Sequence, residues 1–103
     1  EVVFFQSNHE GEIVERIQKA RSQFDALVIN PAAFTHTSVA IRDALLAAGV
    51  LTIELHLSNP AKRESFRRES LISDVVIGTI SGFGEHSYYL AFQAAVELLG
   101  KKQ

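Results

Sequence analysis

The chain has 103 residues, a net charge of −2, 47% hydrophobic residues and no cysteine. Its size predicts one domain, residues 1–103, and its composition is ordinary for a soluble globular domain. The absence of cysteine fits a reducing compartment, and we expect a cytoplasmic location. The lack of a basic excess argues against nucleic acid or a membrane surface as a partner, and the lack of cysteine excludes disulfides and thiolate metal sites.

Strand and helix signals alternate along the chain. Short apolar runs predict strands, and apolar residues at the spacing of one helical face predict helices. Thr35 or Thr37 can cap the second helix and Gly49 closes it, whereas Asn59 and Pro60 open the third. In chain order, the predicted elements are a strand at residues 2–5, a helix at 12–24, a strand at 26–29, a helix ending at 48, a strand at 50–57, a helix at 61–70, a strand at 74–80, and a helix at 86–99 closed by Gly100.

This alternation predicts the fold class. Strands that are apolar on both faces favour an α/β fold, in which helices cover both sides of a parallel sheet. Ligands of such folds bind beyond the carboxyl ends of the strands. The residues to consider first are therefore those that directly follow the predicted strands, namely 6–8, 30–31, 56–58 and 81–82.

The strongest candidate pair is Glu54 and His56. Strand periodicity puts both side chains on one face, about 6.5–7 Å apart along the strand, and a hydrogen bond can close this gap. A carboxylate on one ring nitrogen fixes the tautomer and supports the cationic imidazole, so the other nitrogen can donate a proton. The pair could also be a structural contact at a subunit interface, but its position at a strand end favours an acid–base role.

Two further residues follow the strand at 26–29. Asn30 can both donate and accept hydrogen bonds, which suits a hydroxylated ligand. His36 lies beside a predicted helix N-terminus, which favours anions and the neutral imidazole. Each also has a purely structural interpretation, as a turn asparagine and a helix-cap histidine.

Arginines mark two of the predicted helices. Arg63 and Arg67 share one face of the helix after Pro60, close to the strand that holds His56, and arginine suits carboxylates. A solvated basic face is the alternative. On the second helix, Arg42 and Asp43 suggest an exposed ion pair.

Two motifs in the sequence are specific when they occur in this order, namely Thr-His-Thr-Ser at residues 35–38 and Glu-x-His-x-Ser-Asn at residues 54–59. Together with several other segments, they resemble the type II 3-dehydroquinate dehydratases. The resemblance implies a flavodoxin-like three-layer sandwich that dehydrates 3-dehydroquinate to 3-dehydroshikimate in the shikimate pathway, through an enolate and with no metal or cofactor. The matching segments cover essentially the whole chain and include residues 4–11, 29–38, 42–44, 54–59, 63–64, 66–67 and 82–84.

The resemblance also implies roles for individual residues. His56 matches the general acid that protonates the leaving hydroxyl, Glu54 matches its orienting carboxylate, and Arg63 matches a basic residue of the mobile active-site region. The family assembles as trimers grouped into a dodecamer. The implied substrate-binding residues are Asn30, His36, Arg67, Ser58, Leu57 through its backbone N–H, and Asp43, which reaches the site of a neighbouring subunit.

One departure from the family concerns its N-terminal part. The family begins with a strand ending in Gly-Pro-Asn-Leu-Asn, a lid with an arginine and the base tyrosine, and a helix, and no residues of this sequence match them. In the strand order 2-1-3-4-5 the first strand is central, and its loss leaves unpaired buried backbone groups that cost about 1–3 kcal/mol each. We therefore expect an N-terminally incomplete domain, the C-terminal part of a type II dehydroquinase. We expect it neither to fold nor to act alone, so that a separate N-terminal fragment chain or further residues of the protein would complete it.

The alternative is a non-catalytic flavodoxin-like or receiver-like module for binding or assembly. A receiver domain needs acidic residues after its first strand and a lysine after its last, where this sequence has Ile80 and Ser81. A flavin-binding domain needs a phosphate-binding loop, and none is recognisable. The dehydratase is therefore the leading hypothesis.

Overall fold

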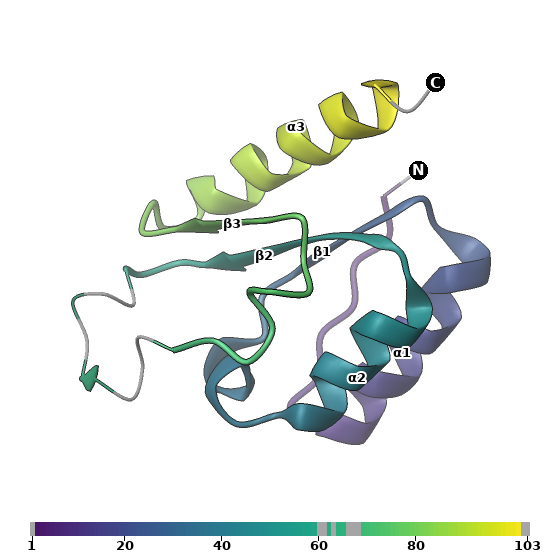
Figure 1. Ribbon diagram of the computed structural model, residues 1–103. Helices are drawn as coiled ribbons and strands as arrows, with labels where there is room; N and C mark the ends of the chain where they lie inside the picture. The colour runs from purple at the N-terminus through teal and green to yellow at the C-terminus, as the bar shows by residue number, and fades with distance from the viewer. Residues whose placement is uncertain (1, 60–61, 63, 66–68, 102–103) are drawn as a thin grey trace.

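Helices cover both faces of a parallel sheet in the computed structural model, which describes residues 2–59, 62, 64–65 and 69–101 (Figure 1). The sheet has the order β1-β2-β3, with both pairs of strands parallel. Helices α1 and α2 lie on one face and α3 lies on the other, so the predicted α/β architecture is confirmed. No helix among these residues has the length and apolar character that crossing a membrane requires. The elements are α1 (Glu10–Gln23), β1 (Ala26–Ile29), the 3-10 helix η1 (Ala32–His36), α2 (Val39–Ala48), β2 (Leu51–His56), β3 (Gly78–Ser81) and α3 (His86–Lys101).

The central strand β2 separates two hydrophobic clusters. Ile53 and Leu55 face α3, where they pack against the small residues Ala91 and Ala95. The opposite cluster lies between β1 and the helices α1 and α2, and includes Ile29. Because side chains alternate along a strand, Glu54 faces away from the α3 cluster. An ionisable side chain is thereby directed into the buried layer on the α1–α2 side.

Helix α2 begins at a different residue from the one predicted. Its N-cap is Ser38, whose Oγ accepts a hydrogen bond from the N–H of Ile41 at 2.9 Å, so the prediction of Thr35 or Thr37 as cap is wrong. The reason is that a 3-10 helix occupies residues 32–36 and keeps both threonines ahead of the cap. The predicted helix end is confirmed, since Gly49 adopts the left-handed conformation (φ 64°) that glycine tolerates best.

Residues 2–5 do not form the predicted strand. They pair with no strand among the described residues, and their apolar side chains are 46–89% exposed. An extended run becomes a strand only when a neighbour takes up its backbone hydrogen bonds. In the strand order expected from the resemblance, this segment is not a neighbour of β1, which explains why it does not add to that edge.

Several predicted boundaries also differ. Helix α1 begins at Glu10, and α3 continues through Gly100 to Lys101, because one glycine costs only about 1 kcal/mol in a helix. Strand β3 begins at Gly78 rather than at residue 74, since Val75 and Val76 pack against the α1–α2 cluster instead of joining the sheet. Half of the residues of the helix predicted at 61–70, namely 61, 63 and 66–68, lie outside the described residues.

Candidate active site

Glu54 and His56 form a hydrogen-bonded pair at the carboxyl end of the central strand. The Nε2 atom of His56 lies 2.6 Å from Oε2 of Glu54. The Glu54 side chain is completely buried, whereas that of His56 is 13% exposed. The sheet register places Glu54 level with Ile29 of β1, and His56 level with Ser81 of β3. The bond expected from strand periodicity is therefore present, with the imidazole at the edge where parallel sheets bind ligands.

Three hydroxyl groups complete the surroundings of the buried carboxylate. Thr35 Oγ1 donates to Oε2 of Glu54 at 2.5 Å, and Ser73 Oγ donates to Oε1 at 2.7 Å. Ser70 Oγ lies 3.2 Å from Oε1 and 3.0 Å from Oε2. With His56, these groups supply a partner to both oxygens of the carboxylate. None of these three residues was predicted from the sequence to belong to the active site.

These contacts determine the ionisation of Glu54. Burial alone would raise the pKa of the carboxyl group, but hydrogen bonds from His56, Thr35, Ser73 and Ser70 outweigh it and lower the pKa to about 2. Glu54 is therefore an anion at neutral pH and accepts hydrogen bonds only. It follows that Nε2 of His56 carries a proton and that Nδ1 is the nitrogen left for a ligand.

The segment carrying the two serines is anchored to η1. The N–H of Leu71 donates to the carbonyl oxygen of Thr35 at 2.6 Å, and Nδ1 of His36 lies 2.6 Å from the carbonyl oxygen of Glu69. A carbonyl oxygen can only accept, so Nδ1 of His36 carries the proton of this hydrogen bond, and Nε2 is the ring nitrogen that does not take part in it. His36 is thus connected to the Glu54 cluster through this segment and not by direct contact with His56.

Arg42 of α2 forms hydrogen bonds with residues 71 and 74, at the end of the segment that carries Ser70 and Ser73. Its Nη1 donates to the carbonyl oxygen of Leu71 at 2.9 Å and to Oδ1 of Asp74 at 2.5 Å, and this hydrogen bond lowers the pKa of Asp74. The ion pair suggested with Asp43 is therefore replaced by one with Asp74. Asp43 lies exposed on α2.

Asn30 follows β1 and is held at both ends of its amide. Its Oδ1 accepts a hydrogen bond from the N–H of Ala32, and its Nδ2 donates to Oη of Tyr88 on α3, both at 3.2 Å. The first bond supports Ala32 in the left-handed conformation (φ 51°), which costs a residue with a Cβ atom roughly 1–2 kcal/mol. Tyr88 is 46% exposed and directs its hydroxyl to this loop.

The segment after β2 lies against the loop before α3. The N–H groups of Gly82 and Gly84 donate to the carbonyl oxygens of His56 and Leu57, at 3.1 and 2.8 Å. Gly82 has a φ of 95°, and a Cβ atom there would lie 3.4 Å from Cβ of Asn59. Leu57 is 40% exposed and Ser58 is exposed, so both line the surface at this end of the sheet. Arg63 and Arg67 lie outside the described residues.

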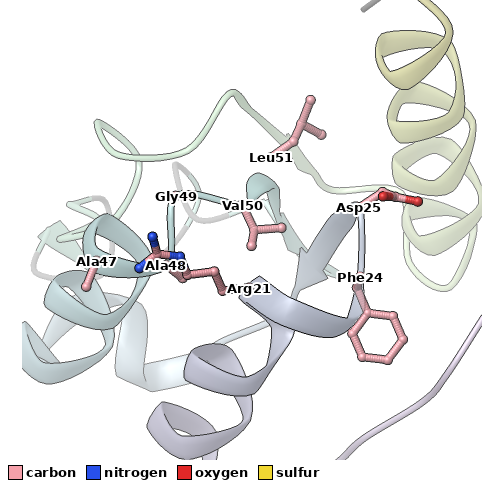
Figure 2. Close-up of a pocket in the computed structure, with 8 residues that line it drawn as sticks. All are labelled: Arg21, Phe24, Asp25, Ala47, Ala48, Gly49, Val50 and Leu51. Atoms are coloured by element: carbon pink, nitrogen blue, oxygen red, sulfur yellow. The ribbon is translucent and has the colours of Figure 1, made fainter. Parts of the chain in front are cut away.

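A shallow pocket of about 490 Å³ lies at the opposite end of the strands (Figure 2). It contains none of the sequence-predicted site residues, and its position at the amino end of β2 separates it from His56. Within the part of the chain that the structure describes, no three histidine, aspartate or glutamate side chains gather as metal ligands would. The pocket is lined by Arg21, Phe24, Asp25, Ala47, Ala48, Gly49, Val50 and Leu51.

Comparison with known proteins gives a consistent result. The chain is 58% identical over 98 residues to the "3-dehydroquinate dehydratase" of Phenylobacterium zucineum, covering 95% of this chain and 68% of that protein. It is 53% identical to the protein of the same name from Campylobacter hominis, covering 95% of this chain and 63% of that one. The chain thus spans about two thirds of the length of these relatives.

Solved structures agree. The type II dehydroquinase from Butyrivibrio crossotus superimposes with a TM-score of 0.90 at 45% identity, covering 92% of this chain and 67% of that one. The type II dehydroquinase from Propionibacterium acnes gives 0.83 at 41% identity, covering 87% and 66%. Residues 1–96 match the protein family described as Dehydroquinase class II, and the chain belongs to this family.

Proposed function

We propose that the protein dehydrates 3-dehydroquinate to 3-dehydroshikimate and so serves the shikimate pathway. The observation that carries the proposal is the hydrogen bond between the buried, ionised carboxylate of Glu54 and the ring of His56 at the end of β2. Membership of the family and the names of the relatives support the same reaction.

In the proposed reaction His56 is the general acid. Removal of the proton beside the ketone gives an enolate, whose electrons re-form the carbonyl while the new carbon–carbon double bond forms and the carbon–hydroxyl bond breaks. The imidazolium of His56 donates its Nδ1 proton to the departing hydroxyl, which leaves as water. Glu54 keeps Nε2 protonated and stabilises the cation before transfer. No residue of this sequence matches the base tyrosine of the family. We therefore assign the base that removes the first proton to no residue of this sequence.

The remaining residues are proposed to bind the substrate. Asn30 directly follows β1, and His36 directly follows Thr35, whose hydroxyl donates to Glu54. Both side chains offer hydrogen-bonding groups to the hydroxyls of the substrate. The backbone N–H of Leu57 and the hydroxyl of Ser58 suit the substrate carboxylate, since both residues directly follow the strand that bears His56. We also propose Arg67 as a substrate ligand.

Assembly and location complete the proposal. The exposed position of Asp43 on α2 is compatible with a role in the site of a neighbouring subunit. A homo-oligomer of trimers grouped into a dodecamer, located in the cytoplasm, would provide such a neighbour. We treat residues 1–103 as part of a single domain within it.

The decisive test is turnover of 3-dehydroquinate. The product contains a conjugated enone, so its absorbance can be followed directly when substrate is added to the intact purified protein. Formation of the enone, lost in the His56→Ala variant, supports the proposal. If the folded intact protein forms no enone, the dehydratase assignment fails and the alternative of a non-catalytic binding or assembly module is favoured.

A further inference from the structure

We propose that Thr35, Ser70 and Ser73 are positioning residues of the active site, which hold Glu54 in one orientation so that its charge always faces Nε2 of His56. This inference rests on the proposed function, because positioning has a catalytic consequence only if His56 is the acid. It assigns a role to three hydroxyl groups that come from two separate segments of the chain, η1 and residues 70–73.

The direction of each hydrogen bond follows from the number of available protons. Ser70 Oγ already accepts hydrogen bonds from the N–H groups of Ile72 and Ser73, both at 3.1 Å. A hydroxyl oxygen has two lone pairs and one proton, so with its lone pairs occupied Ser70 must donate. Its proton lies within reach of both oxygens of Glu54, and of Thr35 Oγ1 at 2.8 Å.

Because the ionised carboxylate of Glu54 can only accept, every group hydrogen-bonded to it acts as a donor. Thr35 and His56 donate to Oε2, Ser73 donates to Oε1, and Ser70 lies between the two oxygens. A carboxylate offers about four lone-pair sites, and these partners fill three of them, or all four when Ser70 gives its single proton to Glu54 rather than to Thr35. The terminal torsion of a glutamate side chain is broad, and in the absence of such partners the carboxylate could rotate away from the ring.

The charged groups around the cluster do not replace this function. Among the described residues, His56 is the only ionisable group that bonds to Glu54. On the neighbouring segments, His36 bonds to the backbone of Glu69, and the guanidinium of Arg42 is directed to Asp74 and to the backbone of Leu71. The uncharged hydroxyls thus fix the orientation of the Glu54 carboxylate relative to the His56 ring.

The test combines nuclear magnetic resonance with kinetics on the intact protein. The titration of Glu54 is followed by the carbon-13 signal of its carboxyl group in the wild type and in the Ser73→Ala and Thr35→Val variants. Ser73 lies on an exposed segment, so its truncation is the variant that disturbs packing least. We expect the midpoint to rise by about one pH unit for each donor removed, since a hydrogen bond to a charged group is worth about this much.

The kinetic measurement tests whether the position of Glu54 matters for catalysis. We expect kcat to fall about tenfold for each donor removed, because one pH unit and a tenfold change in rate correspond to the same free energy. KM should change by less than roughly threefold. Thr35→Ser retains the hydroxyl and should restore both the midpoint and kcat. Thr37→Val, at an exposed threonine two residues away, is the matched control and should leave both unchanged.

The outcomes separate the two proposals. An unchanged Glu54 midpoint in both variants, or a raised midpoint with unchanged kcat, would overturn the positioning role, as would failure of Thr35→Ser to restore kcat. If the folded wild-type protein shows no dehydration of 3-dehydroquinate, the proposed function fails first, and the catalytic part of this inference fails with it. In that case the titration still shows whether the hydroxyls control the charge of Glu54.

Discussion

The amide nitrogen of Asn30 donates a hydrogen bond to the phenol oxygen of Tyr88, 58 residues further along the chain. The loop after β1 is thereby joined to α3 across the end of the sheet. Because Oδ1 of Asn30 is also occupied by the N–H of Ala32, the amide has one orientation. One amide proton and one oxygen lone pair remain for a substrate hydroxyl.

Removing the phenol oxygen should therefore weaken substrate binding. For Tyr88→Phe we expect KM to rise roughly threefold to tenfold, the effect of losing one neutral hydrogen bond, with little change in kcat. Steady-state kinetics with 3-dehydroquinate measures both. Tyr89→Phe is the control, because that ring is 56% exposed and stacks on His86 instead. Equal effects of the two variants would show that the Asn30 contact is unimportant.

Removing the imidazole should affect the chemical step more than binding. For His56→Ala we expect kcat to fall by about 10²–10⁴-fold, the usual contribution of general acid–base catalysis. The control is His86→Ala, at an exposed residue that begins α3. A change confined to KM would contradict the role of His56 as the acid.

The low pKa of Glu54 predicts how stability depends on pH. Its value in the folded protein, about 2, lies below the ordinary value of 4.5, so its stabilising contribution is complete above pH 4.5 and is lost as the pH falls towards 2. A shift of this size corresponds to roughly 3 kcal/mol of unfolding free energy. Urea unfolding of the wild type and of Glu54→Gln across this range provides the measurement. The difference in unfolding free energy between the wild type and Glu54→Gln should shrink as the pH falls through this window. A difference that does not change with pH would refute the low pKa of Glu54.

The position of the α2 cap can be tested by stability alone. Ser38 is buried, accepts from the N–H of Ile41 and also donates to Glu10 of α1. Ser38→Ala should lower the unfolding free energy by about 0.5–2 kcal/mol. Thr37→Ala should change it much less, although the sequence alone offered Thr35 or Thr37 as the cap. A larger loss at Thr37 would reverse the assignment.

The contact between β2 and α3 provides a test of the core. Leu55 is completely buried against Ala91 and Ala95, so Leu55→Ala should cost about 2–5 kcal/mol of unfolding free energy. Val96 is 52% exposed on the same helix, and Val96→Ala should stay within about 0.5 kcal/mol of the wild type. Chemical denaturation compares the two, and similar losses would mean that α3 does not pack as described.

Periodicity along the chain predicted the parts of the fold that depend on neighbouring residues. The alternation of side chains in β2 was enough to place Glu54 and His56 on one face and within hydrogen-bonding distance. The parallel arrangement of β1, β2 and β3 was predicted for the same reason, whereas the prediction of a strand at residues 2–5 was wrong. Residues 75 and 76 were assigned to a strand because an apolar β-branched run does not reveal whether it joins a sheet or packs against helices.

The hydroxyl groups around Glu54 could not be predicted in this way. Thr35 lies 19 residues before Glu54, and Ser73 lies 19 residues after it. Thr35 belongs to η1, between β1 and α2, whereas Ser73 precedes β3, so their convergence is a tertiary contact that no local pattern encodes. The signal that was available is chemical: a fully buried glutamate needs donors, and the small hydroxyl residues nearest in the fold are the ones to search.

The position of β2 between β1 and β3 also has a consequence for how the site can change. Both edges of this strand are hydrogen-bonded, so its amide hydrogens should exchange with solvent among the slowest in the protein. Glu54 and His56 thus stand on the part of the chain that opens least readily. The serines that hold the glutamate belong to a connecting segment, where substitutions and insertions are better tolerated. Variation in that segment would change the orientation of the Glu54 carboxylate from one relative to another without moving the histidine.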